Sequence, residues 1–195
     1  MPVFLTAALS YLLGSIPFGY LLVRGFRGTD VRETGSGNIG ATNVSRTSPV
    51  LGVATLLLDA SKGTAAVFLA RSVFHGDEKL VGLAALFAIL GHMLPVWLRF
   101  RGGKGVATGI GAFLPIAPKA VLVGMAVFLV VFLLLRFVSL ASIAMFAVIP
   151  LAARSFGVAA PTFIFLVTAT VLIVLKHHEN IHRLWNGSES RWGRG

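Results

Sequence analysis

Long apolar runs, separated by short polar segments, set the pattern of this chain. The runs cover residues 1–23, 47–58 with a continuation past Asp59 and Lys62 to residue 70, 80–98, 105–118, 120–135, 137–153 and 155–175. A helix needs about 20 apolar residues to cross a bilayer, and the runs lack the alternation of a membrane β-barrel. The pattern therefore predicts an all-α integral membrane protein. We expect a polytopic helical bundle of about seven helices, the fourth too short to cross alone, with five helices as the main alternative.

The composition agrees with this pattern. Hydrophobic residues make up 56% of the 195 residues and charged residues only 12%, whereas a soluble domain is about 25% charged. This excludes an ordinary cytosolic enzyme or a disordered protein. The length is typical of one domain, so we expect residues 1–195 to form a single multi-pass domain. The chain has no Cys, which excludes disulfides and thiolate chemistry.

Lys and Arg are distributed unevenly between the two sets of predicted loops. The net charge is +10, and with seven helices twelve Lys and Arg residues fall in one set and four in the other. Cytoplasmic loops carry the excess of Lys and Arg in membrane proteins. We therefore expect the N-terminus outside and the C-terminus in the cytoplasm. A basic excess beside a membrane favours anionic lipids or substrates as partners rather than nucleic acid.

Three polar segments fall on the predicted cytoplasmic side, and the first spans residues 35–46. Its G-x-G-x-x-G pattern at Gly35, Gly37 and Gly40 is not a dinucleotide fingerprint, because no βαβ unit surrounds it. It is either a glycine-rich turn or an anion cradle in which backbone N–H groups and a helix end approach an oxyanion. The side chains that would complete such a cradle are Ser36, Asn38, Thr42, Asn43 and Arg46.

The second polar segment contains Arg101, Gly102, Gly103, Lys104 and Gly105, just before the predicted short helix. It does not fit a Walker A loop, so ATP hydrolysis has no support. It is either a second anion cradle around Lys104 or a merely basic interfacial loop. His92, inside the preceding apolar run, is equally a structural hydrogen-bond partner or a functional residue.

The third polar segment contains His177, His178, Asn180 and His182. The histidines resemble a metal cluster, but the chain has no Cys and only seven acidic residues to support one. We expect no metal and no cofactor. His177 and Asn180 are three residues apart and can face one site from a helix.

Asp59 and Lys62 interrupt the second apolar run. Each alone costs roughly 2.5–3.5 kcal/mol at the centre of a bilayer on insertion scales, and their spacing allows them to pair on one helix. A structural ion pair is our leading interpretation. A substrate contact or a proton relay is the alternative.

Together the three segments resemble those of the bacterial acyl-phosphate:glycerol-3-phosphate acyltransferases, the PlsY family. The resemblance is carried by residues 36–43, by Gly91 and His92 with residues 102–105, and by Lys176, His177 and Asn180. It implies a multi-pass enzyme of the bacterial inner membrane that moves a fatty acyl group from acyl phosphate to the sn-1 hydroxyl of glycerol 3-phosphate. The products would be lysophosphatidic acid and phosphate, in phospholipid biosynthesis, and acyl-CoA would not be a donor.

The resemblance also implies roles for particular residues. Ser36, Arg46, Lys104, His177 and Asn180 are the predicted catalytic residues, and Glu179 is a predicted structural residue. The predicted substrate-binding residues are Gly37, Asn38, Gly40, Thr42, Asn43, His92, Arg101, Gly102, Gly103 and Gly105. The base is open between His177, His92 and the departing phosphate of the donor.

Two other classes of function remain. A small transporter for an organic phosphate would also use basic loops and helix ends, although transporters commonly show internal repeats, and we find none. A Mg²⁺-dependent phosphotransferase would need several carboxylates near the phosphates. The sequence offers only Asp30, Glu33, Asp59 and Glu179 for that purpose.

Overall fold

The computed structural model describes residues 1–193, and this part of the chain is helical with no strand. Arg194, one of the basic residues used to predict the orientation, lies outside it. The α-helices and two short 3₁₀ helices are α1 (Pro2–Gly14), α2 (Phe18–Arg27), η1 (Val31–Glu33), α3 (Ala41–Thr47), α4 (Pro49–Val73), α5 (Glu78–Met93), η2 (Val96–Leu98), α6 (Val106–Phe113), α7 (Pro118–Leu135), α8 (Val138–Ser155), α9 (Ala160–Leu175) and α10 (His178–Trp185).

The predicted membrane helices are present. Within residues 1–193, five helical segments are long and apolar enough to cross a membrane, or six if α9 and α10, which meet at a 50° bend, form one broken span. The helix α6, with 8 residues, corresponds to the predicted short fourth helix and is too short to cross alone. The prediction of an all-α membrane protein with about seven apolar helices, one of them short, is confirmed.

Local sequence explains where these helices begin and break. The first predicted helix is divided into α1 and α2 at residues 15–17, where Pro17 removes a backbone donor. Ser48 caps α4, and Pro49 occupies its first turn, as expected for a helix start. The last long helix begins at Ala160, because α8 continues to Ser155 and Gly157 turns the chain with a φ of +74°.

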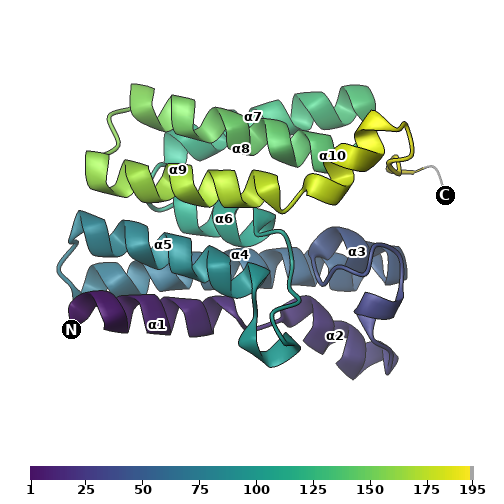
Figure 1. The fold of residues 1–195 in the computed structure, drawn as a ribbon, viewed down its shortest axis with the longest axis horizontal. Coiled ribbons are helices and arrows are strands. Elements are labelled where there is room, and N and C mark those ends of the chain that lie inside the picture. Colours follow the sequence, from purple (N-terminus) through teal and green to yellow (C-terminus); the bar gives the residue numbers. More distant parts are fainter. Residues whose placement is uncertain (194–195) are drawn as a thin grey trace.

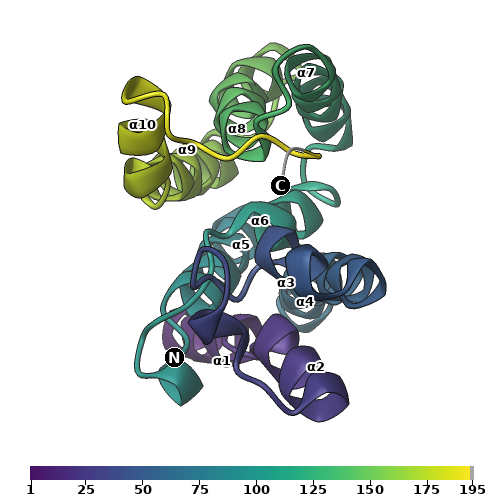
Figure 2. The same ribbon diagram turned by 90° about the vertical axis from the view of Figure 1, so that its right-hand side faces the viewer.

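The helices form two groups that lie side by side, each running along the length of the molecule (Figure 1). One group contains α1 to α6 and the other contains α7 to α10, as the end-on view shows (Figure 2). The groups meet where α5 and α6 pack on α9. Their shared core contains Phe113, Phe146, Ile89, Ile149 and Ile173.

The polar segments gather at one end of the bundle. The N-terminus lies at one end of the molecule, and α3 and α10 both lie at the opposite end (Figure 1). The loop that contains Lys104 reaches the same end, since Lys104 bonds to Asn180 of α10. The predicted clustering of the three segments at one end is therefore confirmed.

Candidate active site

Asn43 organises the first polar segment from inside. Its buried side chain amide donates hydrogen bonds to the carbonyl oxygens of Val31, Thr34 and Asn38, at 2.9–3.0 Å. Its Oδ1 accepts a hydrogen bond from the Ser36 N–H at 2.9 Å. These bonds fold the segment between η1 and α3 into a tight turn. The polar atoms of Asn43 are thus engaged with the backbone, and its predicted role in substrate binding stays a prediction.

The backbone of this turn differs from the predicted anion cradle. The N–H of Ser36 is bonded to Asn43, that of Gly37 to the carbonyl of Thr34 at 3.0 Å, and that of Gly40 to Asn38 Oδ1 at 2.8 Å. These three N–H groups are therefore engaged in this conformation, whereas the N–H groups of Ala41 and Thr42, in the first turn of α3, have no hydrogen-bond partner within residues 1–193. The anion cradle at this segment stays a prediction, and the exposed side chains beside it are those of Ser36, Thr42 and Arg46.

Arg46 projects from α3 towards the C-terminal segment. Its guanidinium donates a hydrogen bond to Ser190 Oγ at 3.0 Å. The same side chain lies beside Gly35, where an added Cβ would come within 3.3 Å of Arg46 Nη1. Arg46 is exposed, and no carboxylate of residues 1–193 lies within 4.0 Å of its guanidinium. The guanidinium therefore keeps donors available for an anion from solution.

The second polar segment is a loop that rests on His92. The Gly103 N–H donates to the His92 carbonyl at 3.0 Å, and a Cβ on Gly103 would overlap the His92 ring. Gly105 adopts a φ of +85°, which favours glycine, and serves as the N-cap of α6. Arg101 is exposed, and no hydrogen bond of its side chain to residues 1–193 is present.

Lys104 connects this loop to α10. The side chain is partly buried, and its Nζ donates a short hydrogen bond to Asn180 Oδ1. Burial, reinforced by the positive charge of Arg183, lowers the pKa of the Lys104 ammonium from its ordinary value. The site thus combines the half-buried cation of Lys104 with the exposed cation of Arg46, beside Arg183, which is paired with Glu189.

The junction between α9 and α10 contributes His177 and Asn180, both buried. His177 Nδ1 lies 2.8 Å from the carbonyl of Ile173. Because a carbonyl can only accept, Nδ1 carries the proton and a neutral ring has Nε2 as its acceptor. His178 and His182 are exposed, and no group of three potential metal ligands is found in residues 1–193.

Glu189 is the residue that the sequence analysis missed. Its carboxylate accepts hydrogen bonds from Ser139 and Asn180 at 2.6 Å and from Arg183 at 2.7 Å. Although burial opposes ionisation, these donors hold the pKa of the Glu189 carboxyl below its ordinary value. One signal was available: Glu189 is one of only seven acidic residues and follows Asn180 by nine positions.

Glu179, the predicted structural carboxylate, lies elsewhere. Its side chain is 65% exposed and is 4.0 Å from Arg183, whereas the side chain of Glu189 is 7% exposed and 2.7 Å from the same arginine. The structural role of Glu179 stays a prediction. Glu189 is the carboxylate that connects α8, α10 and the C-terminal segment.

The predicted pairing of Asp59 and Lys62 is confirmed. Lys62 Nζ is 2.7 Å from Asp59 Oδ1, and both side chains are buried. Lys62 also donates to the carbonyl of Ile16 at 2.7 Å. His92 lies next to this pair, with Nδ1 3.5 Å from Asp59 Oδ1.

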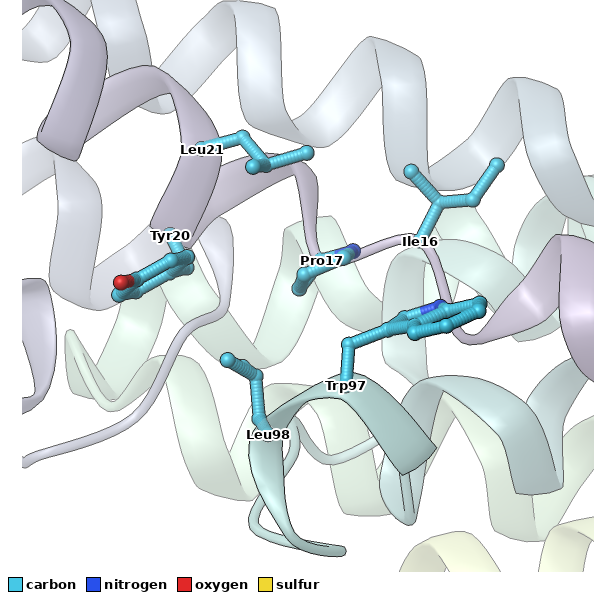
Figure 3. Close-up of a pocket in the computed structure, with 6 residues that line it drawn as sticks. All are labelled: Ile16, Pro17, Tyr20, Leu21, Trp97 and Leu98. Atoms are coloured by element: carbon cyan, nitrogen blue, oxygen red, sulfur yellow. The ribbon is translucent and has the colours of Figure 1, made fainter.

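A separate hollow of about 360 Å³ lies between the α1–α2 break and η2 (Figure 3). It is lined by Ile16, Pro17, Tyr20, Leu21, Trp97 and Leu98. No charged side chain lines it, so it lacks the groups that a phosphate needs. The cationic site is instead formed by α3, the loop before α6, and α10.

These observations define a class of protein: a helical membrane protein with a polar, cation-bearing site at one end of its bundle. The family model for glycerol-3-phosphate acyltransferase matches residues 4–187. The chain therefore belongs to the glycerol-3-phosphate acyltransferase family.

Individual relatives agree over the whole chain. The chain is 47% identical to the glycerol-3-phosphate acyltransferase of Agrobacterium fabrum, covering 97% of this chain and 91% of that one. It is 42% identical to that of Wolbachia pipientis, covering 98% and 100%. The crystal structure of PlsY (YgiH), an integral membrane glycerol 3-phosphate acyltransferase, in its glycerol 3-phosphate form, matches with a TM-score of 0.93 and 38% identity over 99% of this chain and 96% of that one. The lysophosphatidic acid form matches with a TM-score of 0.91 and 37% identity, with the same coverage.

Proposed function

We propose that this chain transfers a fatty acyl group from acyl phosphate to the sn-1 hydroxyl of glycerol 3-phosphate, giving lysophosphatidic acid and phosphate. Membership of the glycerol-3-phosphate acyltransferase family supports the acceptor. So does the likeness to PlsY in forms named for glycerol 3-phosphate and for lysophosphatidic acid, its monoacyl derivative. The choice of acyl phosphate as donor rests on the resemblance of the three polar segments to the PlsY family.

The single observation that carries the proposal is the joining of two cations at one end of the bundle. Lys104 is bonded to Asn180, Asn180 donates to Glu189, and the next residue, Ser190, accepts from Arg46. Two substrates that each carry a phosphate are bound strongly by Lys and Arg side chains, and this site offers both. We assign Lys104 to the phosphate of glycerol 3-phosphate and Arg46 to the phosphate of the donor.

The reaction needs no covalent enzyme intermediate. The glycerol hydroxyl oxygen attacks the acyl carbonyl carbon, the bond between that carbon and the phosphate oxygen breaks, and phosphate departs. Acyl phosphate is a mixed anhydride with a good leaving group. The enzyme then contributes alignment of the two substrates and neutralisation of charge by Lys104 and Arg46. Ser36 is exposed and follows Gly35, which lies against Arg46, and its N–H is bonded to Asn43, so we assign its contribution to the hydroxyl.

The proton of the glycerol hydroxyl goes to an oxygen of the departing phosphate. A histidine base is less well placed. His92 is 3% exposed and lies beneath the loop, with its Nε2 against Gly103. His177 is 2% exposed, and we assign it to holding the junction of α9 and α10 through its bond to Ile173.

We further propose that the end of the bundle bearing this site faces the cytoplasm of a bacterial inner membrane. The twelve-to-four distribution of Lys and Arg supports this orientation. Because the chain has no Cys, single cysteines placed near Ser36, Lys104 and His177 can be labelled individually. An impermeant thiol reagent should reach none of them from outside intact cells. Labelling of any one of the three would refute the orientation.

The activity itself is tested with purified protein, acyl phosphate and glycerol 3-phosphate, with and without EDTA. We expect lysophosphatidic acid to form equally well in both conditions. In a parallel reaction with acyl-CoA as donor, we expect none. Loss of activity in EDTA that Mg²⁺ restores, or comparable turnover of acyl-CoA, would overturn the proposal.

A further inference from the structure

Three ionisable side chains lie buried beneath the loop that carries Lys104. Asp59 is 1% exposed, and Lys62 and His92 are each 3% exposed. They come from α4 and α5, and both α4 and the segment Glu78–Leu98 that contains α5 are long and apolar enough to cross a membrane. Ionisable groups at such depth are costly to bury and commonly serve a function.

The ion pair accounts for only part of this cluster. Lys62 Nζ contacts Asp59 Oδ1 at 2.7 Å and donates to the carbonyl of Ile16, at the break between α1 and α2. An ion pair with only a structural role would need no contact beyond these two. His92 Nδ1, however, has no hydrogen-bond partner in residues 1–193, and it faces Asp59 Oδ1 at 3.5 Å.

The other side of His92 supports the loop. Its carbonyl accepts the Gly103 N–H at 3.0 Å, and its Nε2 lies against Gly103. The adjacent Gly102 packs so closely on the His92 carbonyl that it also has no room for a Cβ. The next residue, Lys104, reaches Asn180. The contacts therefore run without interruption from Ile16 through Lys62, Asp59 and His92 to the loop.

We propose that Asp59, Lys62 and His92 are positioning residues that hold residues 102–105 from beneath. Asp59, held by Lys62, fixes the orientation of the His92 ring. The His92 ring in turn fixes the position of Gly103, which packs on it. Lys104 is thereby kept at the place where it meets the phosphate of glycerol 3-phosphate. This last consequence rests on the proposed function, whereas the control of the loop does not.

The decisive variant removes both charges together. Asp59→Leu with Lys62→Met leaves no lone buried charge, and such replacement of a buried pair is often tolerated. His92→Phe is the second variant, because it keeps a ring under Gly103 but removes Nδ1 and Nε2. The matched control is Thr162→Val, since Thr162 is also fully buried and bonds to Glu78, which begins α5, whereas His92 lies near its end.

The first readout is the mobility of the loop, measured without any substrate. A nitroxide on Arg101→Cys is a unique label, because the chain has no native Cys. We expect a new mobile component in the electron paramagnetic resonance spectrum of this label when either variant is introduced into the labelled chain. We expect no change in the spectrum with Thr162→Val. Identical spectra in all backgrounds would overturn the proposal. So would lowered thermal stability of the variants without added mobility, because that is the behaviour of a purely structural pair.

The second readout is steady-state kinetics in the unlabelled background. We expect the double variant to raise KM for glycerol 3-phosphate about tenfold, the effect of losing one good hydrogen-bonded anchor, and to change KM for acyl phosphate much less. Thr162→Val should leave both values unchanged. Equal increases in both KM values would contradict specific control of this loop. If the wild-type protein has no acyltransferase activity, the proposed function fails. The positioning role still stands in that case, provided that the variants increase the mobility of the nitroxide label.

Discussion

The two glycine-rich segments of the site look alike in sequence but are held in different ways. The turn at residues 35–40 is held from within, by the buried amide of Asn43 three residues further on. The loop at residues 102–105 is held from outside, by His92 beneath it and by Asn180 at the tip of Lys104. The first is therefore a local structure, whereas the second depends both on the preceding helix α5 and on α10, which is far away in the chain.

This difference changes what the glycines do. The N–H groups of Gly37, Gly40 and Gly103 are already bonded, so these three do not meet an oxyanion in this conformation. Gly37 provides a turn with a φ of +67°, whereas Gly103 provides space for the His92 ring. We infer that the side chains of Arg46 and Lys104 supply the positive charge that an anion meets at this site.

Removing the half-buried cation should have the largest effect. We expect Lys104→Ala to lower kcat/KM by about 10³-fold, the effect of removing one preorganised charge-stabilising donor from an active site. Lys176→Ala is the matched control, because Lys176 is also a partly buried lysine at this end but makes no ion pair or side-chain hydrogen bond within residues 1–193. Steady-state kinetics of both variants test this prediction. Similar losses of kcat/KM in both variants would show that Lys104 contributes only to the overall positive charge and makes no specific contact.

Changing the exposed cation should have a smaller effect. We expect Arg46→Lys to lower kcat/KM about 10–100-fold despite the retained charge, because an ammonium cannot reproduce the planar fork of a guanidinium on a phosphate. The loss should appear mainly when acyl phosphate is varied. Arg99→Lys, at another exposed arginine, is the control. Full activity of Arg46→Lys would show that Arg46 supplies only charge.

Removing the charge of Glu189 should have the smallest effect on catalysis and a clear effect on stability. We expect Glu189→Gln to lower the midpoint of thermal unfolding and to reduce kcat only several-fold, because Lys104 keeps its direct bond to Asn180. Glu179→Gln, at an exposed carboxylate, should change neither. An equal fall in the midpoint of thermal unfolding in Glu189→Gln and Glu179→Gln would show that Glu189 has no special role in stability.

The pH dependence of this loss follows from the direction of the pKa shift. The pKa of Glu189 is lowered from 4.5, so the fold favours the ionised form. The stabilisation of the fold by ionised Glu189 is complete at pH values above the ordinary pKa of 4.5. It is lost as the pH falls through the lower pKa of Glu189 in the folded state. The difference between wild type and Glu189→Gln should therefore shrink at acidic pH. A difference that grows on acidification would contradict this assignment.

The sequence predicts the parts of this protein that local patterns determine. The apolar runs indicate the helices, Ser48 and Pro49 mark the start of α4, and the short run after Gly105 indicates α6. The break at Pro17 had a local signal, but the long apolar run around it masked that signal.

Contacts between distant residues could not be predicted. Lys104 and Asn180 are 76 positions apart, and Arg46 and Ser190 are 144 apart. No local pattern indicates that Gly103 meets the His92 ring or that Glu189 returns to Asn180. These contacts depend on how α5, α8 and α10 pack, and the packing also decides which polar atoms remain free for a substrate.

The most direct test of this account is the equilibrium binding of glycerol 3-phosphate to Gly103→Ala, beside Gly25→Ala as a control with open space around its added Cβ. On Gly103 the added methyl overlaps the His92 ring, so the ring or the loop that carries Lys104 must shift. Because the His92 ring is buried, we expect the loop to move. We predict a Kd for glycerol 3-phosphate raised at least about tenfold, equivalent to roughly 1.4 kcal/mol, with binding unchanged in Gly25→Ala. Unaltered binding of glycerol 3-phosphate to folded Gly103→Ala would contradict the assignment of this loop to that substrate.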